Sequence, residues 1–253
     1  MKPQTHFSGM KSFFILWFGQ SLSSLGSSMT GFALILWVYR RQGTVSSLSL
    51  LSLFTCLPSI LFCYAAGTIA DRWDKKKIML VSDFVAAAGT MSILFLNASG
   101  RLAIWHLYAV NFAISCMNAF QNPASCVAVS LLAPREQYNR VGAMQSFSGA
   151  LNSVAAPALA TAVMAFGGLQ TVLIVDLATF AFAFLSLMCF IRLPEQEEKA
   201  LTAQGFSRSF REGLAFLKGN RAILKIILFF ALINFFAYLT GFGILPALIL
   251  ART

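Results

Sequence analysis

Amide and hydroxyl side chains recur at helical spacing inside otherwise apolar stretches of this sequence. Such groups exchange hydrogen bonds with water or with a small molecule, and in a lipid environment they have to face protein or water. Spacings of three and four residues place each set on one helix face. We predict a water-accessible cavity, with hydrogen bonding between helices as the alternative. Its candidate residues are Gln20, Ser24, Asn111, Asn118, Asn122, Asn152, Asn234 and Tyr238.

Two carboxylates, Asp83 and Asp176, also lie within apolar stretches. A carboxylate in a membrane is costly unless it is partnered, and it is a candidate for coupling to a proton or another cation. Counting residues from the flanking bases places each acid toward one membrane face rather than the centre. We therefore favour structural pairing or capping over ion coupling for both.

No pattern in the chain predicts catalysis. The sequence has no nucleophile elbow, phosphate-binding loop or HExxH segment, and His6 and His106 lack a second ligand at metal spacing. The five cysteines are all in apolar stretches without a CxxC pair. We expect no enzyme activity, no metal and no cofactor.

The composition identifies the class of protein that has to position these groups. Of 253 residues, 58% are hydrophobic and 11% are charged, whereas soluble domains carry about 25% charge. Seven apolar stretches are long enough to cross a bilayer. They are Phe13–Tyr39, Leu48–Ala70, Ile78–Leu96, Leu102–Leu132, Val141–Phe166, Leu169–Ile191 and Ile223–Leu250.

The basic residues predict the orientation of these spans. With the N-terminus in the cytoplasm, 15 of the 19 Lys and Arg residues fall on the cytoplasmic side. The concentration of basic residues on the cytoplasmic side then explains the net charge of +10, and we expect no nucleic-acid partner. Between the sixth and seventh spans, residues 193–221 combine a polar linker with a basic amphipathic helix.

Two local patterns predict conformational roles. The fifth span contains Gly149, Ala156, Pro157 and Ala160, whose small side chains allow close helix packing and whose proline adds a kink or flexible point. The stretch from Gly67 to Lys77, GTIADRWDKKK, is a charged turn between the second and third spans. We expect Asp71 to cap an adjacent helix N-terminus.

The charged turn resembles the signature of the major facilitator superfamily, G-x-L-a-D-R-x-G-R/K-R/K. Gly67, Asp71, Arg72, Lys75 and Lys76 match it, and Asp74 replaces the second glycine. DRWDKKK, with WFGQSLSSLGSSMTGFALILWVY and LLAPREQYNRVGAMQS, is similar to the macrolide-efflux and enterobactin-exporter branch. The resemblance implies an all-α integral membrane protein: a six-helix N-terminal bundle plus the first helix of a C-terminal bundle. By the same resemblance, the charged turn would act as a conformational gate. Residues 149–161 would be a degraded form of the antiporter motif of that family.

The resemblance also implies a function for the whole protein. We expect an exporter of small amphipathic molecules in the cell membrane that uses alternating access and an ion gradient. Residues 1–192 would form the first bundle, 193–221 the linker, and 222–253 the seventh span. The rest of the second bundle would come from the same gene or a partner, since the chain looks like a fragment or truncation. The alternative is a non-transporting assembly partner or regulator.

Overall fold

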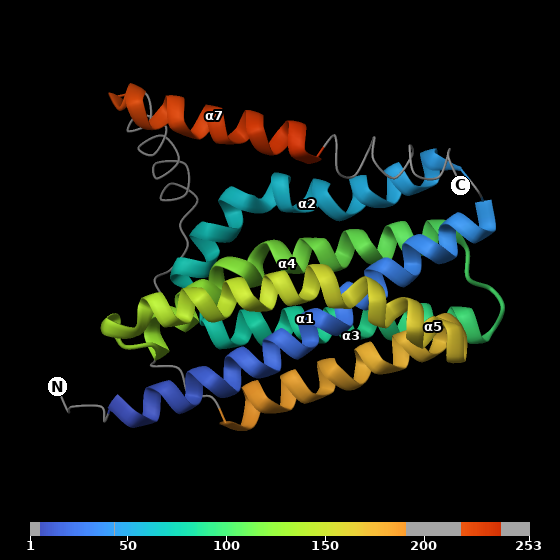
Figure 1. Ribbon diagram of the computed structural model, residues 1–253, viewed down its shortest axis with the longest axis horizontal. Coiled ribbons are helices and arrows are strands. Elements are labelled where there is room, and N and C mark those ends of the chain that lie inside the picture. The colour runs from blue at the N-terminus through green and yellow to red at the C-terminus, as the bar shows by residue number, and fades with distance from the viewer. Residues whose placement is uncertain (1–5, 43, 191–218, 239–253) are drawn as a thin grey trace. The chain divides into compact units, whose positions relative to one another are not determined.

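The computed structural model describes residues 6–42, 44–190 and 219–238, and every regular element in them is helical. The helices are α1 (His6–Gln42), α2 (Val45–Arg72), α3 (Lys75–Ala98), α4 (Ile104–Leu132), the short 3-10 helix η1 (Arg135–Gln137), α5 (Tyr138–Phe190) and α7 (Arg221–Tyr238). Figure 1 shows α1 to α5 lying lengthwise beside one another. The chain is therefore all-α, as predicted.

Two compact units divide the chain, residues 1–199 and residues 200–253. The first contains α1 to α5, and α7 is the described helix of the second. The predicted amphipathic helix of the linker lies mostly outside the described residues. By length and composition, three described helices could cross a membrane: α1 from Met10, α3 and α5.

The charged turn is much shorter than the eleven residues that the sequence suggested. Helix α2 continues to Arg72 and α3 begins at Lys75, so only Trp73 and Asp74 separate them. Our expectation of a loop from Gly67 to Lys77 was wrong, because helical hydrogen bonding extends through the charged residues on both sides. The side chains of Asp71 and Arg72 lie outside the described part of the structure.

Helix α5 contains two of the predicted spans, joined by a sharp turn at Gly168. This glycine has φ 67° and ψ −165°, while Pro157 lies inside the helix. Few residues other than glycine adopt a positive φ of this kind. The turn divides α5 into residues 138–167 and residues 169–190.

Apolar side chains in the first unit form two separate clusters. Phe13, Met79 and Leu187 belong to the cluster at one end of the helices, and Leu34, Ile93 and Leu173 belong to the cluster at the other end. On α1, α3 and α5 the residues between the two clusters include Gln20, Asp83 and Asp176. We call this middle region the polar layer.

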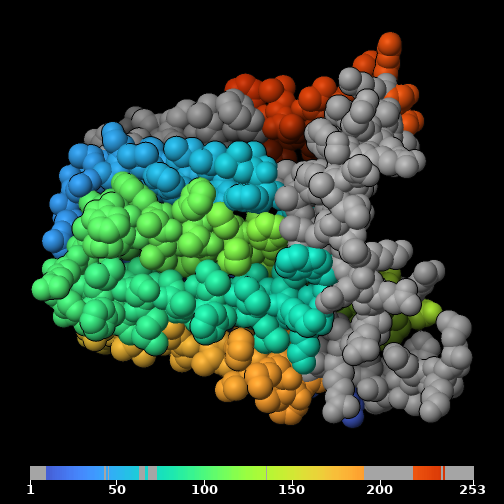
Figure 2. All heavy atoms as spheres, turned by 180° about the vertical axis from the view of Figure 1, so that it is seen from behind, coloured from blue at the N-terminus to red at the C-terminus, as the bar shows by residue number. Residues whose placement is uncertain are grey.

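The helix pairing determines which side chains meet in the polar layer. Helix α1 packs mainly on α5, α2 on α4, and α3 on both α4 and α5. Figure 2 shows α2, α4, α3 and the end of α5 in that order across one face. Consequently, side chains of α1, α3, α4 and α5 converge from elements far apart in the sequence.

Candidate functional site: a polar cavity between helices

A cavity of about 250 Å³ opens within the polar layer. Its wall is formed by α1, α3 and α4, with Phe180 contributed by α5. The polar lining includes Gln20, Ser24, Ser27, Asp83, Asn118 and Asn122. The predicted polar faces of α1 and α4 thus line one space together with Asp83 of α3, and Ile114 and Phe180 add apolar surface.

Asp83 is held by amide groups from two other helices. The Gln121 Nε2 atom of α4 donates to Asp83 Oδ1 at 2.6 Å, and Gln20 Nε2 of α1 donates to Asp83 Oδ2 at 3.3 Å. The side chain is 3% exposed, and among the described residues no cation lies within ion-pair distance of it. Neutral donors therefore hold a carboxyl group against the cavity wall.

A second cavity, of about 420 Å³, lies between α1, α4 and the first part of α5. It shares Gln20, Ser24, Asn122 and Ser125 with the first cavity. Asn152 of α5 lines it and donates to Ser24 Oγ at 2.7 Å, while Ser21 and Ser148 hydroxyls are 2.8 Å apart. The two cavities are contiguous through α1 and α4.

Not every predicted cavity residue reaches these spaces. Asn111 Nδ2 donates to the Leu107 carbonyl in its own helix at 2.8 Å, and the residue lines neither cavity. Asn234 likewise donates to Phe230 of α7 at 2.8 Å. The Tyr238 side chain lies outside the described residues. Any contribution of α7 to the cavity stays a prediction.

Asp176 occupies a different environment in the same layer. The side chain is 1% exposed. Ser27 Oγ of α1 lies 3.4 Å from Oδ1, and Thr90 Oγ1 of α3 lies 3.3 Å from Oδ2. Hydroxyl groups surround this acid, in contrast to the amides around Asp83.

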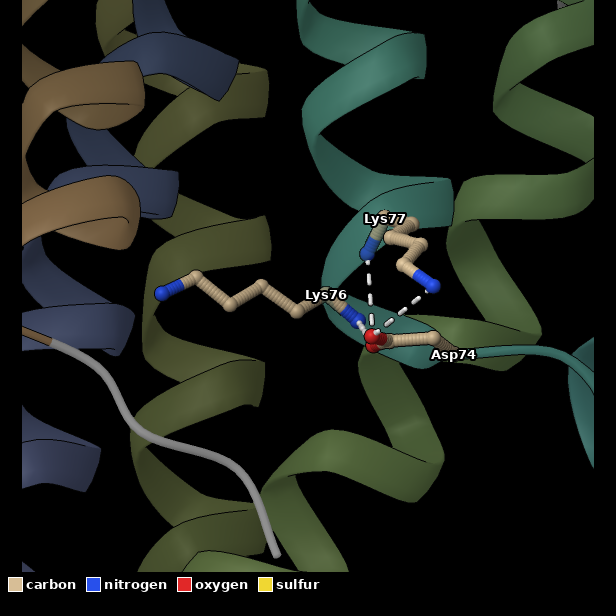
Figure 3. Close-up of polar contacts among 3 residues, drawn as sticks. All are labelled: Asp74, Lys76 and Lys77. Atoms are coloured by element: carbon tan, nitrogen blue, oxygen red, sulfur yellow. Dashed lines mark hydrogen bonds and ion pairs between the residues drawn. The ribbon is translucent and has the colours of Figure 1, made fainter. Parts of the chain in front are cut away.

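The short turn between α2 and α3 is organised by Asp74 (Figure 3). The Asp74 carboxylate accepts from the Lys76 and Lys77 backbone amides at 2.8 and 3.4 Å, which caps the N-terminus of α3. Lys77 Nζ lies 4.0 Å from the same carboxylate, and the Lys77 side chain is largely exposed while that of Asp74 is partly exposed. The residue in the place of the signature glycine is thus a helix cap.

Lys76 connects this turn to the end of α5. Its side chain points away from Asp74 (Figure 3), and Nζ donates to the Met188 carbonyl at 3.1 Å. This contact joins the first turn of α3 to α5. Lys75 is buried at the start of α3. The gating candidates therefore differ in their local contacts.

The residues of the candidate motif in the fifth span lie in two different environments, an apolar cluster and the second cavity. Ala156 and Ala160 are buried in the apolar cluster that also contains Met29 and Ala33 of α1. Gly149 lines the second cavity, and Thr161 Oγ1 donates to the Pro157 carbonyl at 2.8 Å. The alanines lie where α1 and α5 pack together.

Sequence reasoning missed Gln121, the closest partner of Asp83. It lies one position before Asn122 and therefore just beside the predicted stripe of α4. An unpaired acid in an apolar stretch implies donors on neighbouring helices, and that signal could have led to Gln121. His106 accepts from the Ala103 backbone amide at 3.1 Å at the start of α4, so it has a structural contact.

Comparisons with known proteins agree on one family. The family model described as Major Facilitator Superfamily matches residues 16–252. Macrolide efflux protein A of Streptococcus pyogenes is 27% identical over 217 residues, covering 85% of this chain and 53% of that protein. Macrolide efflux protein A of Enterococcus faecalis is 27% identical over 188 residues, covering 74% and 58%.

A Bacillus subtilis (strain 168) protein described as the uncharacterized MFS-type transporter YfiS is 27% identical over 228 residues, covering 88% of this chain and 53% of that protein. The chain thus spans about half the length of the curated relatives it matches.

Proposed function

Because the chain belongs to the major facilitator superfamily, we propose that its full-length protein exports small amphipathic molecules across the cell membrane. Family membership makes it a transporter-type protein rather than an enzyme. The observation that carries the proposal is the polar cavity between α1, α3 and α4. Relatives named for macrolide efflux support export as the direction and drug-like molecules as the substrate.

The composition of the cavity supports an amphipathic substrate. Amides, hydroxyls and one carboxylate lie beside Ile114 and Phe180 in the first cavity, and beside Leu16 and Trp17 in the second. Binding sites for small molecules combine apolar surface with a few placed polar groups. A ligand with apolar surface and several hydrogen-bonding groups fits this lining.

The proposed mechanism is alternating access driven by an ion gradient. Residues Gly67 to Lys76 act as the gate at one end of the bundle, and Gly149, Ala156, Pro157 and Ala160 allow α5 to repack against α1. The remaining helices of the second bundle complete the cavity from the same gene or a partner. The N-terminus lies in the cytoplasm, because basic residues concentrate on that side.

Drug accumulation in cells tests this proposal. We would express the full-length gene in a host lacking its own macrolide exporters and measure retention of radiolabelled macrolides and other amphipathic compounds. The expected result is lower accumulation of at least one compound, which dissipation of the ion gradient restores. Accumulation equal to that of empty-vector cells across the panel would count against export.

A matched pair of asparagine variants tests the cavity itself. Asn118→Leu removes an amide from the cavity lining, whereas Asn111→Leu removes an amide bonded within its own helix. We expect the Asn118 variant to lose most export and the Asn111 variant to keep it at equal expression. Equal export by both variants would contradict the proposed lining.

A further inference from the structure

Asp176 of α5 faces hydroxyl oxygens from two other helices and has no cation partner among the described residues. Ser27 and Thr90 contribute hydroxyls from α1 and α3. The Thr30 hydroxyl of α1 is buried beside the same carboxyl group, in a position that does not give a regular hydrogen bond to any described residue. A buried hydroxyl without a regular hydrogen bond indicates a missing partner at this position.

We propose that Asp176, Ser27, Thr30 and Thr90 form a binding site for a sodium ion. This inference does not depend on the proposed export. The four side chains offer five oxygen atoms, two of them from the carboxylate. Hard cations prefer oxygen ligands of this kind.

Ser27 and Thr90 are within hydrogen-bonding distance of Asp176, but both contacts are long. A hydroxyl that donates to a carboxylate is normally about 2.5–2.7 Å from it, whereas here the separations are 3.4 Å for Ser27 and 3.3 Å for Thr90. Oxygens at right angles around a hard cation, each about 2.3–2.6 Å from it, lie about 3.3–3.7 Å apart. The observed spacing matches coordination to a shared ion.

The charge selects a monovalent ion. One carboxylate and three neutral hydroxyls balance a single positive charge, and a divalent ion would leave a buried excess charge, which is costly. The ion also has a route, because Ser27 lines the polar cavity while its hydroxyl faces Asp176. Sodium can therefore enter from the cavity and pass Ser27.

Thermal unfolding of the purified full-length protein tests the site. Transitions would be compared in sodium chloride and in choline chloride at equal ionic strength and pH. We expect sodium to raise the melting temperature with saturation, as a ligand of the folded state does. Asp176→Asn should abolish the sodium effect, and Asp83→Asn, whose carboxyl group contacts amides, should retain it.

Equal melting temperatures of the wild-type protein in both salts would overturn the proposal, as would a sodium effect that persists in Asp176→Asn. If the Asp176 variant does not fold, Ser27→Ala decides, because it removes one neutral ligand at the cavity side. Its half-saturating sodium concentration should rise about tenfold, comparable with the loss of a supporting group at other metal sites. An unchanged half-saturating concentration would equally overturn the site.

Discussion

At the scale of single residues, the Gln121–Asp83 contact has the clearest energetic consequence. Hydrogen bonds between neutral groups on membrane helices contribute about 0.6 kcal/mol on average. Here the acceptor is a buried carboxyl group and the contact is 2.6 Å long. Loss of the donor leaves Asp83 with only the 3.3 Å contact from Gln20.

We predict that Gln121→Leu destabilises the folded protein by about 1–3 kcal/mol, measured by thermal unfolding in detergent. Asn111→Leu is the control, because it removes an amide that bonds only within its own helix. The double variant Gln121→Leu/Asp83→Asn should lose less stability than the sum of the two single variants, since the carboxylate that Gln121 stabilises is then absent. Strictly additive losses would show that the two residues are not coupled.

Asp74 governs the start of α3 through a cap that opposes an unfavourable charge pattern. Lys75, Lys76 and Lys77 occupy the first turn of the helix, where the helix dipole disfavours positive charge. The capping carboxylate offsets this and also accepts two backbone amides. The exposed ion pair with Lys77 adds little by comparison.

We predict a graded loss of stability at this position. Asp74→Ala removes both cap and charge and should cost about 1–2 kcal/mol. Asp74→Asn keeps the acceptor and loses the charge, so about 0.3–1 kcal/mol is expected. Lys77→Gln should cost less than either, and hydrogen exchange of the first α3 turn would locate the effect. An asparagine variant as unstable as the alanine variant would exclude the capping role.

At the scale of elements, the contact of α1 with α5 depends on the absence of a side chain at Gly26. A Cβ atom there would lie 2.9 Å from Asp176 Oδ1 and 3.2 Å from Asp176 Cα. Gly31 is on the same helix, and an added Cβ would meet nothing within 4 Å. Alanine substitution at Gly26 therefore reports on close packing, whereas the same substitution at Gly31 reports on helix propensity alone.

We predict that Gly26→Ala destabilises the protein by about 1–3 kcal/mol, as overpacking does. Gly31→Ala should be neutral or stabilising by up to about 1 kcal/mol, because alanine favours helix. Unfolding midpoints of the two variants against wild type provide the measurement. If both variants were equally stable, α1 and α5 would not approach closely at Gly26.

The elements also show why sequence reasoning succeeded for helices and fell short for individual contacts. Apolar length and charge interruptions identified the helices from α1 to α5, because a bilayer demands continuous apolar segments. Periodicity identified the polar faces of α1 and α4, yet it could not show that Asn111 bonds within its own helix. Periodicity also left Gln121 outside the predicted polar face of α4. Its contact with Asp83 forms only when α3 and α4 pack together.

Capping is determined by where a helix begins, and that position was not evident in GTIADRWDKKK. The continuation of α2 through Arg72 leaves Asp74 as the residue before α3, so the cap is Asp74, whereas Asp71 was expected to cap a helix. The predicted domain boundary, the linker helix and the roles of Asp71, Arg72 and Tyr238 stay predictions.

At the scale of the whole molecule, the surface of the first unit has two kinds of exposed region. Phe84 is 64% exposed, Phe95 71% and Val154 76%, which would be unfavourable in water but suits contact with lipid. The polar cavities expose Asn118, Asn122 and Cys126 instead. A membrane-impermeant thiol reagent can distinguish these regions, since lipid excludes charged reagents and disfavours the thiolate.

We predict that Cys126, retained as the single cysteine of the full-length protein, reacts with a charged maleimide in membranes. A Phe84→Cys variant in a background without the native cysteines should react much more slowly, although both positions are exposed in the bundle. Labelling after denaturation in detergent supplies the reference for each. An exported compound should slow labelling of Cys126, because this residue lines the second cavity. If Cys126 reacted in intact membranes as slowly as the cysteine of the Phe84→Cys variant, the polar cavity would not be open to water. Export through this cavity would then lack its pathway.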